Sequence, residues 1–126
     1  GGNSWKTEEL ERSMVSSDIK SEIIFTGYLP DSEVTWYMRN CQLFSFPSLY
    51  EGFGIPPFEA LLNGAKVVGT TESELKYFGH LRNLVLFDPH LDDLATVMQD
   101  AIKLESASVE RIEFRFDRSE LIKLVT

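Results

Sequence analysis

The stretch that decides the fold of this chain is Pro47-Ser48-Leu49-Tyr50-Glu51-Gly52-Phe53-Gly54-Ile55-Pro56-Pro57-Phe58-Glu59-Ala60. In it, a loop with two glycines runs into the start of a helix, and two carboxylates flank the glycines. Glycines free backbone N–H groups to face a ligand, and a helix N-terminus adds partial positive charge, so the combination favours phosphate binding. Flanking carboxylates suit hydroxyl groups, and a nucleotide diphosphate sugar carries hydroxyls on both sides of its diphosphate.

The prolines narrow the choice of backbone donors in this loop. Pro56 and Pro57 open the helix, because early helical positions need no N–H bond, and neither residue has an N–H to offer an anion. We therefore expect the donors to be the backbone N–H groups of Gly52, Phe53, Gly54 and Ile55.

Two carboxylates complete the predicted site. Glu59 falls in the first turn of the helix, beside an apolar stripe of Phe58, Leu61 and Leu62, and is placed to accept hydrogen bonds from a ribose diol. Glu51 precedes the glycines and is placed to take hydroxyls on the sugar side. A purely structural interpretation stays open, because a glutamate in a first turn often complements the helix dipole and a Gly-x-Gly often only makes a turn.

The rest of the chain alternates between helical and strand patterns. Short apolar, β-branched runs predict strands at residues 22–26, 42–46, 66–69 and 83–87. Periodicity and capping residues predict helices at residues 5–15, from Asp31 or Ser32 to Cys41, from Pro56 to Gly64, at 91–104 and at 119–125, and a short helix or turn at 72–78. Near-continuous apolar strands separated by helices predict an α/β fold, with a parallel sheet covered by helices on both faces. Ligands of such sheets bind beyond the carboxyl ends of the strands, where the loop after Phe46 and the turn at 27–30 are expected to be neighbours.

Charge and composition limit the partners. The net charge of −8 argues against nucleic acid or an anionic membrane surface. No apolar run approaches the roughly 18 residues of a membrane span, so we expect no insertion into a membrane. A single cysteine, Cys41, and two histidines predict neither a disulfide framework nor a metal site, and they fit a cytoplasmic protein. The length of 126 residues fits one domain, residues 1–126.

The predicted phosphate site has no obvious cation near it in sequence. Between Thr26 and Ala65 the only basic residue is Arg39, and the apolar stripe of its helix turns it outward. A diphosphate normally recruits a cationic side chain. Either Lys66 or a more distant residue folds in, or the charge lies on chain that this sequence does not contain.

Residues 46–60 resemble the signature of the family 4 glycosyltransferases, the retaining group 1 enzymes of GT-B fold. The match includes their E-x7-E motif at Glu51 and Glu59, and it extends to residues 24–31, 63–68 and 86–89. The resemblance implies an enzyme with two Rossmann-like domains and a cleft between them. This chain would be part of the C-terminal, donor-binding domain, truncated at its N-terminus and inactive alone.

The resemblance also implies roles for individual residues. The backbone at 52–55 contacts the phosphate and sugar of the donor, Glu51 contacts the donor sugar as the catalytic residue, and Glu59 holds the ribose. Tyr28 and Leu29 lie against the base. No cofactor and no metal ion are expected beside the nucleotide diphosphate sugar, since the sequence has no Asp-x-Asp element.

Partners and departures follow from the same resemblance. The phosphate-binding Arg and Lys of the family lie upstream, so the partner expected for this chain is a missing N-terminal domain, and an exposed sheet edge makes a homodimer conceivable. Many relatives build polysaccharides or glycolipids, and the parent enzyme is expected in the cytoplasm or at the periphery of a membrane. Lys66 replaces the usual proline, and residues 72–74 lack the proline before Glu74, so we assign Glu74 no donor role.

Two other classes of protein compete with this interpretation. A non-catalytic nucleotide-binding or scaffold module of the same fold is the alternative, and the two retained carboxylates speak against it. A phosphoacceptor receiver domain shares the α/β pattern but needs acidic residues after its strands, and residues 25–27 and 46–48 offer none.

Overall fold

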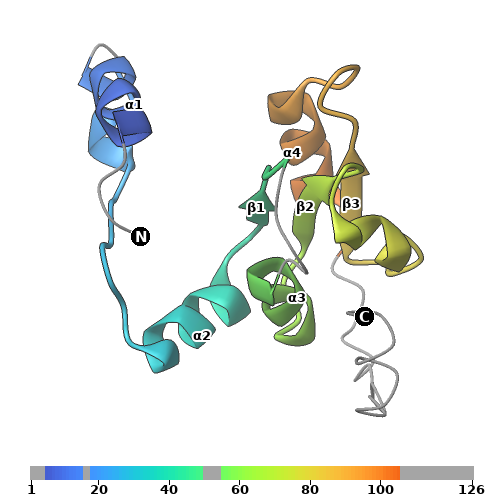
Figure 1. The fold of residues 1–126 in the computed structure, drawn as a ribbon. Coiled ribbons are helices and arrows are strands. Elements are labelled where there is room, and N and C mark those ends of the chain that lie inside the picture. The colour runs from blue at the N-terminus through green and yellow to red at the C-terminus, as the bar shows by residue number, and fades with distance from the viewer. Residues whose placement is uncertain (1–4, 16–17, 50–54, 106–126) are drawn as a thin grey trace. The chain divides into compact units, whose positions relative to one another are not determined.

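The computed structural model describes residues 5–15, 18–49 and 55–105 of the chain (Figure 1). They belong to two units, Gly1–Pro30 and Asp31–Thr126, and each is described here by itself. The helix predicted at 119–125 lies outside the described residues. That the whole chain forms one domain stays a prediction.

The first unit contains helix α1 (Trp5–Val15) and the 3-10 helix η1 (Lys20–Glu22), so the helix predicted at 5–15 is confirmed. The strand predicted at 22–26 is wrong: residues 23–26 have no strand structure, and the side chain of Ile24 is 81% exposed. A strand persists only where a neighbour pairs its backbone N–H and C=O groups. An apolar composition alone therefore does not make this segment a strand.

The second unit is an α/β fold, as predicted. Its elements, in chain order, are α2 (Asp31–Asn40), β1 (Phe44–Phe46), α3 (Ile55–Leu62), β2 (Val67–Thr70), the 3-10 helix η2 (Glu74–Phe78), β3 (Leu84–Phe87) and α4 (Leu94–Lys103). The described strands pair in parallel in the order β1-β2-β3 (Figure 1). The three strands predicted in this part of the chain are therefore confirmed, each shortened at its N-terminal end or shifted by a residue.

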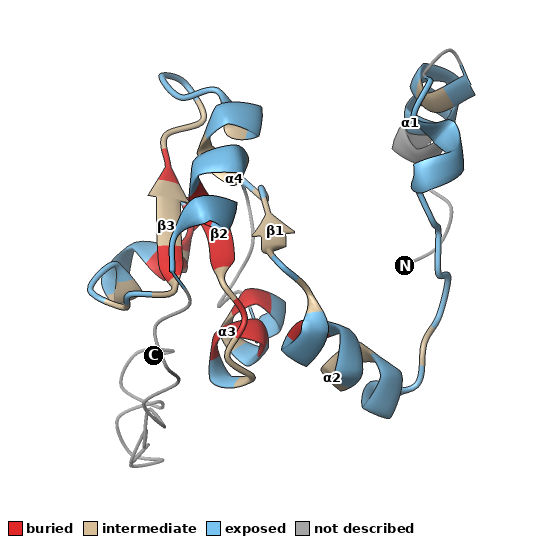
Figure 2. Cartoon of the chain, turned by 180° about the vertical axis from the view of Figure 1, so that it is seen from behind, coloured by how far each residue is buried: buried red, intermediate tan, exposed pale blue. Residues whose placement is uncertain are grey.

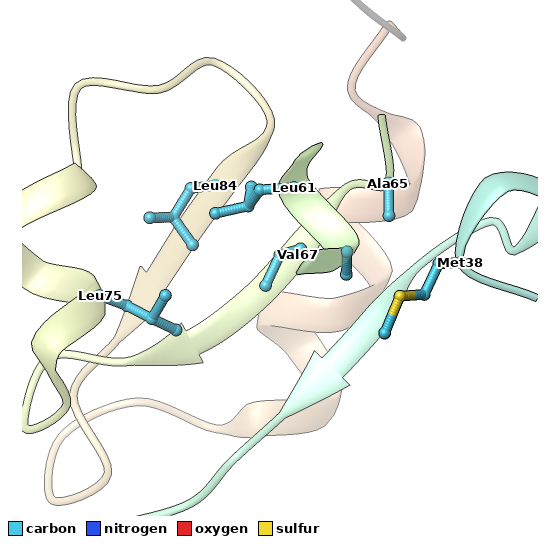
Figure 3. Close-up of a cluster of buried hydrophobic side chains, with 7 residues drawn as sticks. Met38, Leu61, Ala65, Val67, Leu75 and Leu84 are labelled. Atoms are coloured by element: carbon cyan, nitrogen blue, oxygen red, sulfur yellow. The ribbon is translucent and has the colours of Figure 1, made fainter. Parts of the chain in front are cut away.

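Helices cover both faces of this sheet, and successive residues of β2 show it. Val67 belongs to a cluster with residues of α2, α3 and η2, which Figure 3 shows around Leu61 and Leu75. Val68 belongs to a separate cluster with Ala101 of α4. Side chains alternate between the faces of a strand, so α3 and α4 lie on opposite sides of β2. Figure 2 shows buried residues along β2, in α3 and at the ends of β3.

Gly69 explains how η2 comes so close to the sheet. A Cβ atom at Gly69 would overlap Cδ1 of Leu75, whose side chain is itself buried in the first cluster. The absence of a side chain at this position of β2 therefore gives Leu75 its place against the strand.

Gly64 ends helix α3, as predicted, through a Schellman motif. The N–H of Gly64 donates to the carbonyl of Leu61, and the N–H of Ala65 donates to the carbonyl of Ala60, each at 3.0 Å. Gly64 has a φ of 85°, in the left-handed region that glycine adopts without a steric penalty. The turn then leads directly into β2.

The helix predicted at 91–104 starts later than expected, at Leu94, because Asp93 is its N-cap. A carboxylate oxygen of Asp93 accepts hydrogen bonds from the backbone N–H of Thr96 at 3.0 Å and from its hydroxyl at 2.7 Å. Residues 91 and 92 belong to the preceding turn, where Asp92 accepts a hydrogen bond from the N–H of Asp88 at 2.7 Å. The predicted inward face of α4 is confirmed, with Ala101 buried.

We predict that Gly64→Ala lowers the free energy of unfolding by about 1–2 kcal/mol, because a side chain in the left-handed region clashes with its own backbone. Urea unfolding measures the loss. Gly79→Ala is the matched control, since Gly79 has a φ of −58° and its added Cβ would meet Leu86 at an ordinary 3.5 Å. Equal losses in the two variants would contradict this account of the α3 terminus.

We also predict a pH-dependent contribution from Asp93. Hydrogen bonds from the Thr96 side chain and then from its backbone hold the pKa of the Asp93 carboxyl below its ordinary value. The folded state therefore favours the ionised form, so the stabilisation is present above the ordinary pKa and is lost as the pH falls through the lowered one. The melting temperature of Asp93→Ala should fall short of the wild type at about pH 7 and approach it at about pH 2. A difference that stays constant with pH would contradict the prediction.

Candidate functional site

The candidate site lies at the carboxyl ends of the strands. Residues 47–49 follow β1, residues 71–73 follow β2 and residues 88–90 follow β3. Since the three strands are parallel and adjacent, these segments meet at one edge of the sheet, which we call the carboxyl edge. It is the edge at which open parallel sheets bind their ligands.

Two of the predicted donor-binding residues are described in the second unit, and they share one face of α3. Ile55 is the first residue of the helix, and Glu59 follows one turn later. The predicted place of Glu59 in the first turn is therefore wrong, because α3 begins at Ile55 and has no acidic residue in that turn. Residues four apart are neighbours on a helix surface, and both of these are exposed. The carboxylate of Glu59 forms no hydrogen bond or ion pair with any residue that the structure describes. Glu59 thus reaches outward, as predicted, while its binding of a donor stays a prediction.

The opposite face of α3 explains why Glu59 points outward. Pro57, Ala60 and Leu61 are the buried residues of the helix, and their spacing marks one inward stripe. The sequence-based assignment of Leu62 to the buried face is wrong, because its side chain is 49% exposed. Ala60 is buried instead of Leu62, and a pattern based on large apolar residues does not predict this.

Four predicted site residues, Glu51, Gly52, Phe53 and Gly54, lie outside the described residues. Their assignment as catalytic and donor-binding residues stays a prediction. They connect residues 47–49, at the carboxyl edge, to Ile55 at the start of α3.

Tyr28 and Leu29 lie in the first unit. Tyr28 is 93% exposed, and Leu29 is half-buried. Their predicted position at the carboxyl edge depended on a strand at 22–26, and that strand is not formed. Contact of these two residues with a nucleotide base stays a prediction that rests on the resemblance alone.

The structure brings together polar groups at the carboxyl edge that the sequence reasoning missed. The hydroxyl of Thr70 donates to the carbonyl of Ser48, and the distance is 3.3 Å. Oε1 of Glu72 lies 2.7 Å from Nε2 of His90, which joins the segments after β2 and β3. The N–H of His90 also donates to a carboxylate oxygen of Asp88 at 2.8 Å. One signal was available in the sequence, since each of these side chains comes at or shortly after the end of an apolar strand.

Lys66 is not the missing cation of the carboxyl edge. It precedes β2 and therefore lies at the opposite edge of the sheet, where its ammonium donates to the carbonyl of Ile102 at 3.0 Å and to that of Leu104. A cation is favourable there because the last carbonyls of a helix carry partial negative charge. Lys66 is thus excluded as the cation that would neutralise a phosphate at the carboxyl edge. A more distant residue of this chain stays open as that cation.

Other basic side chains also lie away from the carboxyl edge. Arg39 is exposed, as predicted, and its Nε donates to the side-chain oxygen of Asn63 at 2.9 Å. In the described segments at 47–49, 71–73 and 88–90 there is no lysine or arginine, while Glu72 and Asp88 are acidic. The side chains of these segments that can donate a hydrogen bond to an anion are therefore three hydroxyls and an imidazole, those of Ser48, Thr71, Ser73 and His90.

Across the described residues, no group of three or more His, Cys, Asp or Glu side chains is arranged to hold a metal ion. Cys41 is half-buried, and burial raises the pKa of its thiol, although a hydrogen bond with the backbone acts in the opposite direction. Among the helices of the described part of the chain, none has the length and apolar character needed to cross a membrane.

Comparison with known proteins agrees with the fold. Residues 1–115 match the family described as "Glycosyl transferases group 1", and the chain belongs to this family. The matched region contains the parallel sheet, the carboxyl edge and Glu59. No solved structure matches the chain.

Several characterised relatives share this region. The serotype-specific mannosyltransferase WbdA of Escherichia coli is 36% identical over 104 residues, which are 79% of this chain and 13% of that protein. The O-antigen chain mannosyltransferase B of Escherichia coli is 31% identical over 60% of this chain and 20% of its own length. The 2-deoxystreptamine N-acetyl-D-glucosaminyltransferase of Niallia circulans is 26% identical over 82% of this chain and 26% of its own. The chain thus spans only a minor part of each relative.

We predict that Lys66→Met, which removes the ammonium and keeps an apolar stem, lowers the free energy of unfolding by about 0.3–1 kcal/mol. Lys103→Met is the control. Lys103 lies in the last turn of α4, the part of the helix that Lys66 contacts, but its ammonium forms an exposed pair with Asp100 at 3.6 Å. Exposed pairs contribute little, so the control should lose less. Denaturant unfolding of both variants checks this, and a larger loss in the control would contradict the role of Lys66.

Proposed function

We propose that this chain is the donor-binding part of a retaining glycosyltransferase that transfers a hexosyl group from a nucleotide diphosphate sugar to an acceptor hydroxyl. The family match supports sugar transfer, and the parallel α/β fold supports nucleotide binding at the carboxyl edge. The observation that carries the proposal is Glu59: it is exposed, it lies one turn after the start of α3, and its carboxylate has no partner among the described residues. A free carboxylate in that position suits the hydroxyls of a ribose.

The sugar class that the relatives favour is mannose. The names of WbdA and of the O-antigen chain mannosyltransferase B specify mannosyl transfer, and a mannosylfructose-phosphate synthase of Agrobacterium fabrum is 28% identical over 77% of this chain. The relative from Niallia circulans, which is named for transfer of N-acetylglucosamine, has a lower identity of 26%. We therefore propose a mannosyl donor, used in building a polysaccharide or glycolipid.

The chemistry assigns a distinct part to each group of residues. Transfer breaks the bond between the anomeric carbon and the diphosphate, forms a bond from that carbon to the acceptor oxygen, and moves the acceptor proton to the leaving group. Negative charge grows on the leaving diphosphate, so donors aimed at it stabilise the transition state. The backbone N–H groups of residues 52–55 would supply this, with Glu51 on the donor sugar and Glu59 on the ribose.

Nucleotide titration followed by backbone amide shifts tests the proposal. We would titrate the chain with UDP, GDP and ADP, and then with the mannose and glucose esters of the nucleotide that binds. We expect shifts at residues 52–55 and a preference for the mannose ester. No shifts with any of these compounds at millimolar concentration would overturn the proposed donor site.

We predict that Glu59→Gln weakens nucleotide binding about tenfold, because the loss of a charge-assisted hydrogen bond to a hydroxyl costs roughly that factor. Glu33→Gln is the control, since Glu33 is likewise an exposed glutamate on a helix of the second unit. The dissociation constants from the same titration compare the two variants. Equal affinities of wild type and Glu59→Gln would show that Glu59 does not bind the donor.

A further inference from the structure

Thr70 is a fully buried polar residue at the end of β2, whose other residues are two valines and a glycine. It is the last residue of β2, its exposed fraction is 0%, and the strand has β1 and β3 on either side. A buried hydroxyl without a partner would be costly, and among the described residues no buried side-chain N or O atom lacks one. The hydroxyl of Thr70 meets this need through the carbonyl of Ser48, 3.3 Å away.

The contact between Thr70 and Ser48 lies just beyond the end of the pairing between β1 and β2. The recorded pairing between β1 and β2 ends with Phe46 opposite Gly69. The residue after Phe46 is Pro47, which has no N–H and cannot extend the hydrogen-bonded pairing of β1 with β2. Ser48 therefore lies beyond the backbone pairing, and the hydroxyl of Thr70 attaches it to the end of β2.

Thr70 is itself held firmly on its other side. Its carbonyl accepts hydrogen bonds from the hydroxyl of Ser73 at 2.8 Å and from the N–H of Ser73 at 3.2 Å. The hydroxyl of Ser73 in turn accepts from the N–H of Leu75 and caps η2. The backbone next to Thr70 is also tied to β3, because the N–H of Thr71 donates to the carbonyl of Phe87 at 3.0 Å. The donor to Ser48 is thus anchored to the sheet and to η2.

We propose that Thr70 is a positioning residue for donor binding. Its hydroxyl fixes the carbonyl of Ser48, and with it the direction in which the chain leaves the sheet toward residues 50–54. The inference rests on the proposed function, in which the backbone of residues 52–55 binds the diphosphate. Thr70 does not touch the donor; it acts through the main chain of Ser48.

Two substitutions separate the hydroxyl from the volume of the side chain. Thr70→Val keeps the branched shape and removes the donor, while Thr70→Ser keeps the donor and removes a methyl group. We expect Thr70→Val to weaken nucleotide binding about fivefold, the effect of one neutral hydrogen bond. It should also speed amide hydrogen exchange from Ser48 to Ile55 but leave residues 67–69 and 84–87 unchanged. Thr70→Ser should match the wild type in exchange at Ser48–Ile55 and in affinity.

The outcomes distinguish this inference from the proposed function. If the wild type binds none of UDP, GDP or ADP, the proposed function fails, and with it a role for Thr70 in donor binding. If the wild type binds and Thr70→Val has the same affinity and local exchange, the inference is overturned and the proposed function stands. Faster exchange throughout β2 and β3 in Thr70→Val, or a loss in Thr70→Ser as large as in Thr70→Val, would also overturn it. Those results would assign Thr70 a role in folding alone.

Discussion

The burial of β2 is the constraint on which the rest of the second unit depends. All four residues of this strand are buried, with a strand on each side and a helical layer on each face. Complete burial of a valine side chain contributes roughly 1.5–3 kcal/mol, and Val67 and Val68 each supply this on opposite faces. Because parallel strands need connections that cross a face of the sheet, α3 and η2 must lie where β2 can bury their apolar stripes.

The two ends of β2 have different tasks as a result. At the end where the strand begins, Lys66 binds the last carbonyls of α4, and the side chain of Asn83 donates to the carbonyl of Ala65 at 2.8 Å. These contacts tie helix ends and turns to the sheet. At the end where the strand stops, Thr70 and Glu72 reach the segments that follow β1 and β3. The first set holds the fold together, and the second shapes the edge at which a ligand would bind.

The sequence allowed most of this second unit to be predicted, because its signals are local. The run at 66–69, the left-handed Gly64 and the apolar periodicity of α4 each depend on a few neighbouring residues. The segment at 22–26 carries an equally apolar pattern but forms no strand, since pairing requires a neighbour and composition cannot supply one. The same limit applies to contacts between distant residues: Thr70 with Ser48 and Lys66 with α4 join positions that only the folded sheet brings together.

An acidic chain can still bind a phosphate if neutral hydrogen-bond donors, and not cationic side chains, contact the phosphate oxygens. Glu72 and Asp88 put negative charge at the carboxyl edge, while Lys66 and Arg39 are engaged elsewhere. Neutral N–H donors bind phosphate less strongly than cations do, so the backbone of residues 52–55 would orient the diphosphate more than it would hold it. Much of the affinity would then come from hydroxyls, for which a carboxylate such as Glu59 is a strong acceptor. Under the proposed function, the described residues of this chain would then act mainly on the hydroxyls of the donor, through Glu59, because the described lysine and arginine contacts lie away from the carboxyl edge.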